Sequence, residues 1–166
     1  MELSYTKAQK QDAGIIAGLA DRIWKKHYIA IITMEQIEYM LNKMYSAESL
    51  VKQMEEGQEF TIVSLDEKPI GYISISTKDN ENYFLHKFYV EAEEQAKGIG
   101  TKLFGHILQT LRSAKMIELT VNRQNYKAIN FYFKNGFVIK EVADFDIGNN
   151  YFMNDFVMIK KITGRR

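Results

Sequence analysis

Two glycines stand in a short stretch whose residue types suit the binding of an anionic group. The stretch lies between an apolar strand predicted over 84–90 and an amphipathic helix that starts near Gly98, and it reads Gln95, Ala96, Lys97, Gly98, Ile99, Gly100 and Thr101. The first turn of a helix offers backbone N–H groups that lack helical acceptors, at the positive end of the helix dipole. Because glycine has no Cβ, the backbone can turn sharply and approach a ligand closely. The pattern predicts a site for a phosphate or pyrophosphate.

The spacing of the glycines excludes two well-defined phosphate-binding patterns. The chain has no Gly-x-x-x-x-Gly-Lys-Ser/Thr sequence, and no third glycine follows Gly100 at the spacing of a dinucleotide-binding fold. A flexible loop ahead of a helix is the alternative interpretation of the two glycines. The order Gln-x-x-Gly-x-Gly after a strand resembles the acyl-CoA loop of the GNAT superfamily of N-acetyltransferases.

A second stretch resembles another signature of the same superfamily. It contains Asn125, Ala128, the pair Phe131-Tyr132 and the pair Gly136-Phe137, in the family's order and on a predicted short helix. Together the two signatures and their flanking elements cover residues 70 to 142. The resemblance implies an α/β GNAT fold, with a mixed, mostly antiparallel, splayed sheet flanked by helices, and acetyl-CoA as the cosubstrate.

Length and composition favour one globular domain over residues 1–166. Hydrophobic residues make up 46% of the chain and the formal net charge is +1, so a core can form and nothing points to a nucleic-acid partner. The absence of cysteine excludes disulfides and a thiolate nucleophile, and it fits a cytoplasmic location. No apolar run approaches the roughly 18 residues of a membrane span, and the N-terminus is not signal-like. We therefore expect no membrane partner.

The apolar periodicity switches between a helical and a strand-like pattern along the chain. Helices are expected from about 12 to 28, over 34–44 after a capping box at Thr33 and before a break at Tyr45-Ser46, over 47–56 after Ser46, at 98–111 and at 128–134. The first helix is expected to bury Ile15, Ile16, Leu19, Ile23 and Trp24. Strands are expected at 3–7, 59–65, 70–75, 83–90, 116–121, 137–142 and 156–162, with residues 66–69 as a turn that holds the only proline.

The resemblance assigns a role to each signature residue. It implies that the backbone N–H groups of residues 95–101 bind the phosphates of acyl-CoA, and that the pantetheine amides pair with the backbone of Phe88, Tyr89 and Val90. It also implies that Asn125 steadies the pantetheine arm and that Tyr132 protonates the departing CoA thiolate. Packing beside Phe131 and Phe133 is the alternative role for Tyr132.

The acceptor amine must lose a proton, because a primary ammonium with a pKa of about 10 has no lone pair for attack. The family often places a glutamate on the central strand for this, directly or through water, but residues 84–88 contain no carboxylate. His86 is the candidate base, since its ordinary pKa is about 6.5 and it shares a strand face with Phe84 and Phe88. His27 and water are the other candidates, and a structural role is the alternative for either histidine. The histidines lack metal-ligand spacing, so no metal is expected.

The resemblance places acceptor specificity in the first two helices and the last hairpin. Aromatic walls are available there from Trp24, His27, Tyr28, Tyr39 and Tyr45. The C-terminal part, with Asp144, Asp146 and Asp155, resembles bacterial polyamine acetyltransferases of the PaiA type, which implies spermidine or spermine as the acceptor. Without cysteine the amine must attack acetyl-CoA directly. A protein N-terminus, lysine, an amino acid or an aminoglycoside stays open as the acceptor, as does a non-catalytic CoA-binding regulatory module. The family's common dimers suggest a homodimer.

Overall fold

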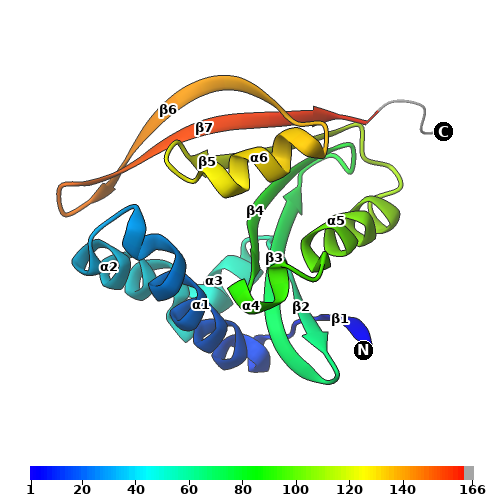
Figure 1. The fold of residues 1–166 in the computed structure, drawn as a ribbon, viewed down its shortest axis with the longest axis horizontal. Helices are drawn as coiled ribbons and strands as arrows, with labels where there is room; N and C mark the ends of the chain where they lie inside the picture. Colours follow the sequence, from blue (N-terminus) through cyan, green and yellow to red (C-terminus); the bar gives the residue numbers. More distant parts are fainter. Residues whose placement is uncertain (163–166) are drawn as a thin grey trace. The chain divides into compact units, whose positions relative to one another are not determined.

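The computed structural model describes residues 1–162, which divide into two compact units (Figure 1). Unit 1 contains residues 1–76 and 87–111, and unit 2 contains residues 77–86 and 112–162. The strand β4 (Asn82–Val90) runs from unit 2 into unit 1. The described strands pair in the order β1-β2-β3-β4-β5-β7-β6. Only the β4–β5 pairing is parallel among the pairings β1–β2, β2–β3, β4–β5, β5–β7 and β6–β7. The predicted mixed, mostly antiparallel sheet is confirmed, whereas one domain over 1–166 stays a prediction.

Unit 1 contains the first three strands, β1 (Leu3–Lys7), β2 (Glu59–Leu65) and β3 (Lys68–Thr77). The turn between β2 and β3 is shorter than the predicted turn over 66–69, because it uses only Asp66 and Glu67, with φ of 48° and 69°. Two positive φ values are typical of a two-residue hairpin turn. Pro69 lies within β3 opposite Ser64, where the register of the two strands shifts, and an irregular ladder tolerates a residue without an N–H.

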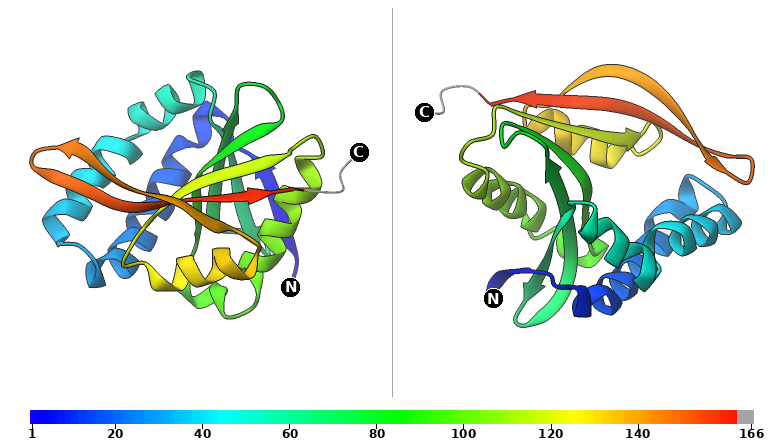
Figure 2. Two further views of the ribbon diagram at one scale, coloured as in Figure 1. Left: turned by 90° about the horizontal axis from the view of Figure 1, so that it is seen from above. Right: turned by 180° about the vertical axis from the view of Figure 1, so that it is seen from behind.

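Helices cover both faces of the strands in unit 1. Figures 1 and 2 show α1 (Ala13–His27), α2 (Met34–Tyr45) and α3 (Ala47–Glu55) on one face and α5 (Ile99–Thr110) on the other. The short helices η1 (Lys10–Asp12), η2 (Tyr28–Ala30) and α4 (Ala92–Gln95) complete the unit. The predicted caps are confirmed, since Thr33 Oγ1 accepts the N–H of Gln36 at 3.1 Å and Ser46 Oγ accepts that of Ser49 at 3.1 Å. The prediction that the first helix buries Ile15 is wrong, because this side chain is 45% exposed.

Unit 2 contains β5 (Met116–Asn122), α6 (Tyr126–Lys134), β6 (Val138–Gly148) and β7 (Tyr151–Lys161). The first part of β4 pairs in parallel with β5, and α6 lies along one face of β5, β7 and β6 (Figure 2). The last two strands are longer than the predicted 137–142 and 156–162, because their hairpin continues to a turn at Asn149 and Asn150. The strand prediction for 137–142 followed an alternation of apolar residues. In β6, much of which is exposed, acidic residues interrupt that alternation.

The core of each unit consists of large apolar side chains from its helices and strands. In unit 1 the fully buried ones include Ile16, Leu19, Ile37, Leu50, Phe60, Ile70, Tyr72, Ile99, Leu103 and Ile107. In unit 2 they include Ile117, Phe137 and Met158. Burying such a side chain stabilises the fold by about 1.5–3 kcal/mol relative to leaving it exposed. None of the helices in residues 1–162 is long and apolar enough to cross a membrane.

Candidate active site

The predicted phosphate-binding turn lies at the start of α5. Gly98 has a φ of +75°, a conformation that residues with a Cβ rarely adopt. A Cβ at Gly98 would meet no atom within 4 Å, so the backbone conformation, not lack of space, favours glycine here. The first hydrogen bond of the helix runs from the N–H of Lys102 to the carbonyl of Gly98 at 3.2 Å. The N–H groups of residues 99–101 therefore have no acceptor within the helix and suit an anion.

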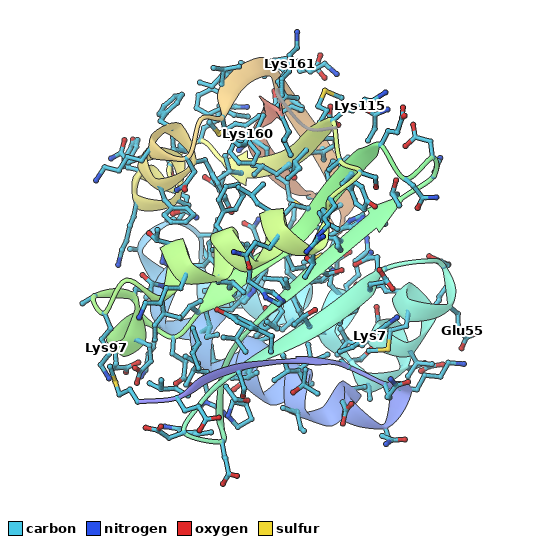
Figure 3. The ribbon with its side chains drawn as sticks, turned by 90° about the vertical axis from the view of Figure 1, so that its right-hand side faces the viewer. Lys7, Glu55, Lys97, Lys115, Lys160 and Lys161 are labelled. Atoms are coloured by element: carbon cyan, nitrogen blue, oxygen red, sulfur yellow. The ribbon has the colours of Figure 1, made fainter. Side chains whose placement is uncertain are left out.

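One side-chain hydrogen bond ties this turn to the end of β4, and one backbone hydrogen bond ties the residue after β4 to β3. Gln95 Nε2 donates a hydrogen bond to the carbonyl of Val90 at 2.7 Å, and the N–H of Glu91 donates to the carbonyl of Ile70 on β3 at 2.8 Å. Figure 3 shows Lys97 at the turn before α5. Val90 is buried, and Phe88 and Tyr89 are half-buried. Unit 1 thus brings together the predicted acyl-CoA residues Phe88, Tyr89, Val90, Gln95, Ala96, Lys97, Gly98, Ile99, Gly100 and Thr101, whose cofactor role stays a prediction.

The acidic residues beside the turn are each paired with a base. Glu91 accepts from Arg22 at 3.0 Å, Glu93 pairs with Lys26 at 2.6 Å, and Glu94 pairs with Lys97 at 2.8 Å. The hydrogen bond from Lys26 lowers the pKa of the exposed Glu93. Because these carboxylates are balanced by cations, they oppose the approach of a phosphate less than unpaired carboxylates would.

Two predicted site residues, Asn125 and Tyr132, lie in unit 2 on α6. Asn125 is 5% exposed and caps the helix, since its Oδ1 accepts the N–H of Ala128 at 3.4 Å. Tyr132 is 7% exposed, and its ring centroid lies 5.6 Å from that of Phe131 and 5.4 Å from that of Phe137. Both residues have structural roles in the described contacts, and their roles toward acetyl-CoA stay predictions.

The two candidate bases belong to different units. His86 in unit 2 is exposed, and its ring lies 4.7 Å from that of Phe84, as expected for residues on one strand face. His27 is the last residue of α1 in unit 1, half-buried, with its ring 4.8 Å from that of Tyr28. The role of either histidine as the base stays a prediction. Within residues 1–162 there is no cluster of three or more His, Cys, Asp or Glu side chains able to hold a metal ion.

The acidic residues of the last hairpin already have partners or are buried. Asp144 forms an ion pair with Arg123 at 2.9 Å, and Asp146 Oδ1 accepts the N–H of Gly148 at 2.9 Å. Asp155 is 2% exposed, and burial raises its pKa to about 6. The carboxylates of Asp144 and Asp146 therefore hold parts of unit 2 together, whereas the carboxyl group of Asp155 is withdrawn from solvent.

The predicted aromatic walls divide into a buried group and a more exposed pair. Trp24, Tyr28 and Tyr45 are buried, and the ring of Trp24 lies 4.5 Å from that of Tyr28 and 5.5 Å from that of Tyr45. His27 and Tyr39 are half-buried, and the ammonium of Lys43 lies 5.7 Å from the centre of the Tyr39 ring. The buried group belongs to the core of unit 1.

Sequence analysis did not single out Lys87. Lys87 is half-buried in unit 1, and its Nζ donates to Gln53 Oε1 at 2.6 Å and to Gln58 Oε1 at 3.1 Å. The available signal was alternation, since Leu85, Lys87 and Tyr89 lie on one face of β4. A lysine between apolar and aromatic residues on one strand face indicates a side chain that is partly shielded from solvent.

Comparison with known proteins gives the chain its family. The model of the acetyltransferase (GNAT) family matches residues 24–137, which include both signatures. The chain belongs to the GNAT family. It is similar to a spermidine N(1)-acetyltransferase of Thermoplasma acidophilum, with 27% identity over 168 residues, 97% of this chain and 98% of the relative.

Solved structures support the GNAT fold. The PaiA N-acetyltransferase of Thermoplasma acidophilum in complex with coenzyme A superimposes with a TM-score of 0.80 and 28% identity, covering 98% of this chain and 100% of that one. A GCN5-related N-acetyltransferase of Rhodopseudomonas palustris gives a TM-score of 0.80 at 18% identity, which supports the fold alone. This GNAT protein is an acetyl-CoA-dependent N-acetyltransferase, so the predicted fold, cosubstrate and reaction class are confirmed.

Proposed function

We propose that this GNAT enzyme acetylates a primary amine of a polyamine such as spermidine or spermine. The observation that carries the proposal is the similarity, over nearly the full length of both chains, to the Thermoplasma acidophilum spermidine N(1)-acetyltransferase. The likeness to the PaiA–coenzyme A complex has the same extent. The proposal keeps the acceptor predicted from the C-terminal part of the sequence. A cytoplasmic location and a homodimer stay predictions.

The residues of unit 1 fit the anionic end of acetyl-CoA. The N–H groups of residues 99–101 face no helical acceptor, and the acids around them are paired. We assign the pyrophosphate to this turn and the pantetheine amides to the backbone of Phe88, Tyr89 and Val90, with Asn125 steadying the pantetheine arm. Acetyl-CoA supplies the acetyl thioester. The chain's own residues bind and orient it, and orientation of two reactants can contribute several kcal/mol to lowering the barrier.

The acceptor amine attacks directly, because the chain has no cysteine to carry an acetyl group. We assign Tyr132 the donation of a proton to the sulfur that departs, since a neutral phenol can donate a hydrogen bond there. General acid help of this kind is worth about 10²- to 10⁴-fold in rate. His86, His27 and water are the sequence-derived candidates for taking up the proton of the amine.

The test of the acceptor is thiol release from acetyl-CoA against a panel of amines. The panel contains spermidine, spermine, putrescine, lysine, an aminoglycoside, a basic peptide and a peptide with a free N-terminus. Fast release with a polyamine supports the proposal. Faster release with a peptide, lysine or aminoglycoside would instead assign the enzyme to one of the alternative acceptor classes. Coenzyme A binding without release on any amine would favour the regulatory module.

The test of the proton donor is the Tyr132→Phe variant. We expect its kcat to fall at least about tenfold with little change in the Kd of acetyl-CoA, because the ring is kept and only the donor is lost. Phe131→Tyr is the matched control, since it adds a hydroxyl to the neighbouring ring on the same helix. Unchanged turnover in Tyr132→Phe would leave that side chain with its packing role alone.

A further inference from the structure

Two cations of α1 balance the charge of the segment that leads into the phosphate-binding turn. This acidic segment, residues 91–97, contains three glutamates and one lysine that pairs with one of them, so two negative charges are left over. Arg22 Nε donates a hydrogen bond to Glu91 Oε1 at 3.0 Å. Lys26 Nζ donates to Glu93 Oε1 at 2.6 Å. The acidic segment is therefore electrically neutral only together with the two cations of α1.

The two ion pairs differ in how much solvent surrounds them. Arg22 and Lys26 lie four residues apart on one face of α1. The side chain of Glu91 is 13% exposed, whereas the side chains of Lys26 and Glu93 are 63% and 59% exposed. Solvent and salt screen a pair of exposed charges more strongly than a shielded pair. The pair of Arg22 and Glu91 is therefore expected to have the larger effect.

The four charged side chains also influence one another. The hydrogen bond to Glu93 raises the pKa of Lys26, and the negative charges of Glu93 and Glu91 add to this rise. The positive charge of Arg22 opposes it. The two ion pairs thus form one network, in which both carboxylates feel the loss of one cation.

Backbone hydrogen bonds join the acidic segment to the phosphate-binding turn. The N–H of Gln95 donates to the carbonyl of Glu91 at 3.2 Å, and the N–H of Gly98 donates to the carbonyl of Gln95 at 3.2 Å. The N–H groups of residues 99–101, to which we assign the pyrophosphate, follow directly along the chain. Because the acidic segment continues into this site, a glutamate in it that had no cation would repel the phosphates.

We propose that Arg22 and Lys26 determine the preference of this enzyme for a thioester that carries phosphates. They act through Glu91 and Glu93, whose charges they cancel, and need not touch the cofactor. The inference rests on the proposed placement of the pyrophosphate at residues 99–101. It adds to the cofactor site two positioning residues that lie 69 and 67 residues from their partners along the chain.

The first test is calorimetry of coenzyme A binding to Arg22→Met in about 20 mM salt. Methionine keeps an apolar stem but removes the charge, so Glu91 is left unbalanced. We expect the Kd to rise about tenfold, and to rise about threefold in Lys26→Met, whose ion pair is more exposed. In about 0.5 M salt the loss in Arg22→Met should shrink to less than about threefold, because the Debye length is then about 4 Å.

Lys25→Met is the matched control for both variants. Lys25 lies on the same helix and carries the same charge, but its Nζ pairs with Asp21 of α1 at 2.9 Å and not with the acidic segment. Its removal should leave the Kd of coenzyme A unchanged. Equal weakening in Lys25→Met and Arg22→Met would show that the net charge of the protein attracts the cofactor, and would overturn the inference.

The second test compares acetyl-CoA with S-acetylpantetheine, which has the same thioester and amides but no phosphates. With the most active amine of the panel, Arg22→Met should lower kcat/KM for acetyl-CoA about tenfold and leave kcat within about twofold of wild type. The kcat/KM for S-acetylpantetheine should not change. A merely structural role of Arg22 would lower kcat/KM for both thioesters alike, and that result would refute the charge-balancing role.

Rescue by a second substitution separates an indirect role from direct contact. Adding Glu91→Gln to Arg22→Met removes the unbalanced carboxylate and should bring the Kd of coenzyme A back to within about threefold of wild type. A double variant as weak as Arg22→Met would mean that the guanidinium itself binds a phosphate. If Arg22→Met does not fold, Glu91→Gln alone decides: tighter binding supports the inference, and equal or weaker binding refutes it.

These results are distinguishable from failure of the proposed function. Absence of coenzyme A binding in the wild-type protein would refute the proposed cofactor site. Wild-type binding with the same Kd in Arg22→Met and Lys26→Met would overturn only the role of these two cations.

Discussion

Gly71 on β3 lies so close to β4 that a single methyl group should disturb the proposed cofactor site. A Cβ at this position would overlap the carbonyl oxygen of Tyr89 and would lie 3.1 Å from Val90 Cα and 3.3 Å from the carbonyl carbon of Tyr89. All three are backbone atoms, which cannot rotate away as a side chain can. The neighbouring hydrogen bond from the N–H of Glu91 to the carbonyl of Ile70, at 2.8 Å, holds the two strands together. Gly71→Ala must therefore push the strands apart.

The magnitude follows from the atoms that must move. Overpacking a core by one methyl group costs about 1–3 kcal/mol, and weakening one backbone hydrogen bond adds about 1 kcal/mol. We expect the free energy of unfolding to fall by about 2–4 kcal/mol, measured by urea denaturation followed by circular dichroism. Because Tyr89 and Val90 are assigned to the pantetheine amides, loss of one or two hydrogen bonds should also weaken coenzyme A binding by about 5- to 30-fold, measured by calorimetry.

Gly14→Ala is the matched control for Gly71→Ala. Gly14 lies on α1 with an ordinary backbone conformation, and a Cβ there would meet no atom within 4 Å. The control should raise the free energy of unfolding by about 0.5–1 kcal/mol, since alanine favours a helix more than glycine does. If Gly71→Ala proved as stable as wild type, close approach of the strands would not be the reason for glycine. If it lost stability but bound coenzyme A normally, the assignment of the β4 end would be contradicted.

Substitutions at three further positions test single features. Asp155→Asn should remove a pH dependence of stability. The pKa of Asp155 is about 6 in the folded state against an ordinary 3.8, so the native state binds the proton more tightly and the free energy of unfolding of the wild type falls as the pH rises from 4 to 6. Urea denaturation at pH 7 should therefore show the variant to be more stable by roughly 1–3 kcal/mol. Unchanged pH dependence in that variant would refute the assignment. Asn125→Ala should cost about 1 kcal/mol through loss of the cap, whereas Asn125→Asp keeps the cap; weaker coenzyme A binding in both variants would indicate a separate role for the Asn125 amide. Gly98→Ala should cost about 1–2 kcal/mol because of the positive φ, and Gly98→Asn less; equal thermal stability of wild type and both variants would contradict this.

The local features of the fold could be predicted from the sequence because each has a local physical cause. Nearby residues in the sequence determine several of these features. Examples are the cap at Thr33, the strand that begins at Asn82 and the helix that begins after Gly98. The order of the two signatures then indicated the GNAT fold and its cosubstrate. The cap at Asn125 was not predicted, since the sequence indicates a helix from residue 128, whereas the structure begins α6 at Tyr126 with Asn125 as its cap.

The errors concern features that depend on contacts distant in sequence. Asp66 and Glu67 both adopt positive φ values, and glutamate, unlike aspartate, is rarely found there, so the short hairpin turn could not be predicted from composition. Ile15 fits the helical period of α1, but it lies outside the face that the strands cover, as its exposure shows. The setting of Lys87 depends on Gln53 and Gln58, which lie far from it along the chain and meet it only in the folded unit.

The measurement that tests the central proposal most directly is identification of the product. The enzyme is incubated with spermidine and acetyl-CoA carrying ¹³C in the acetyl group, and the polyamine is analysed by mass spectrometry while released thiol is counted. We predict one labelled acetyl group on spermidine for each thiol released, with none on the protein. Thiol release without labelled spermidine, or labelled spermidine no faster than the enzyme-free reaction, would contradict the assignment of this chain as a polyamine N-acetyltransferase.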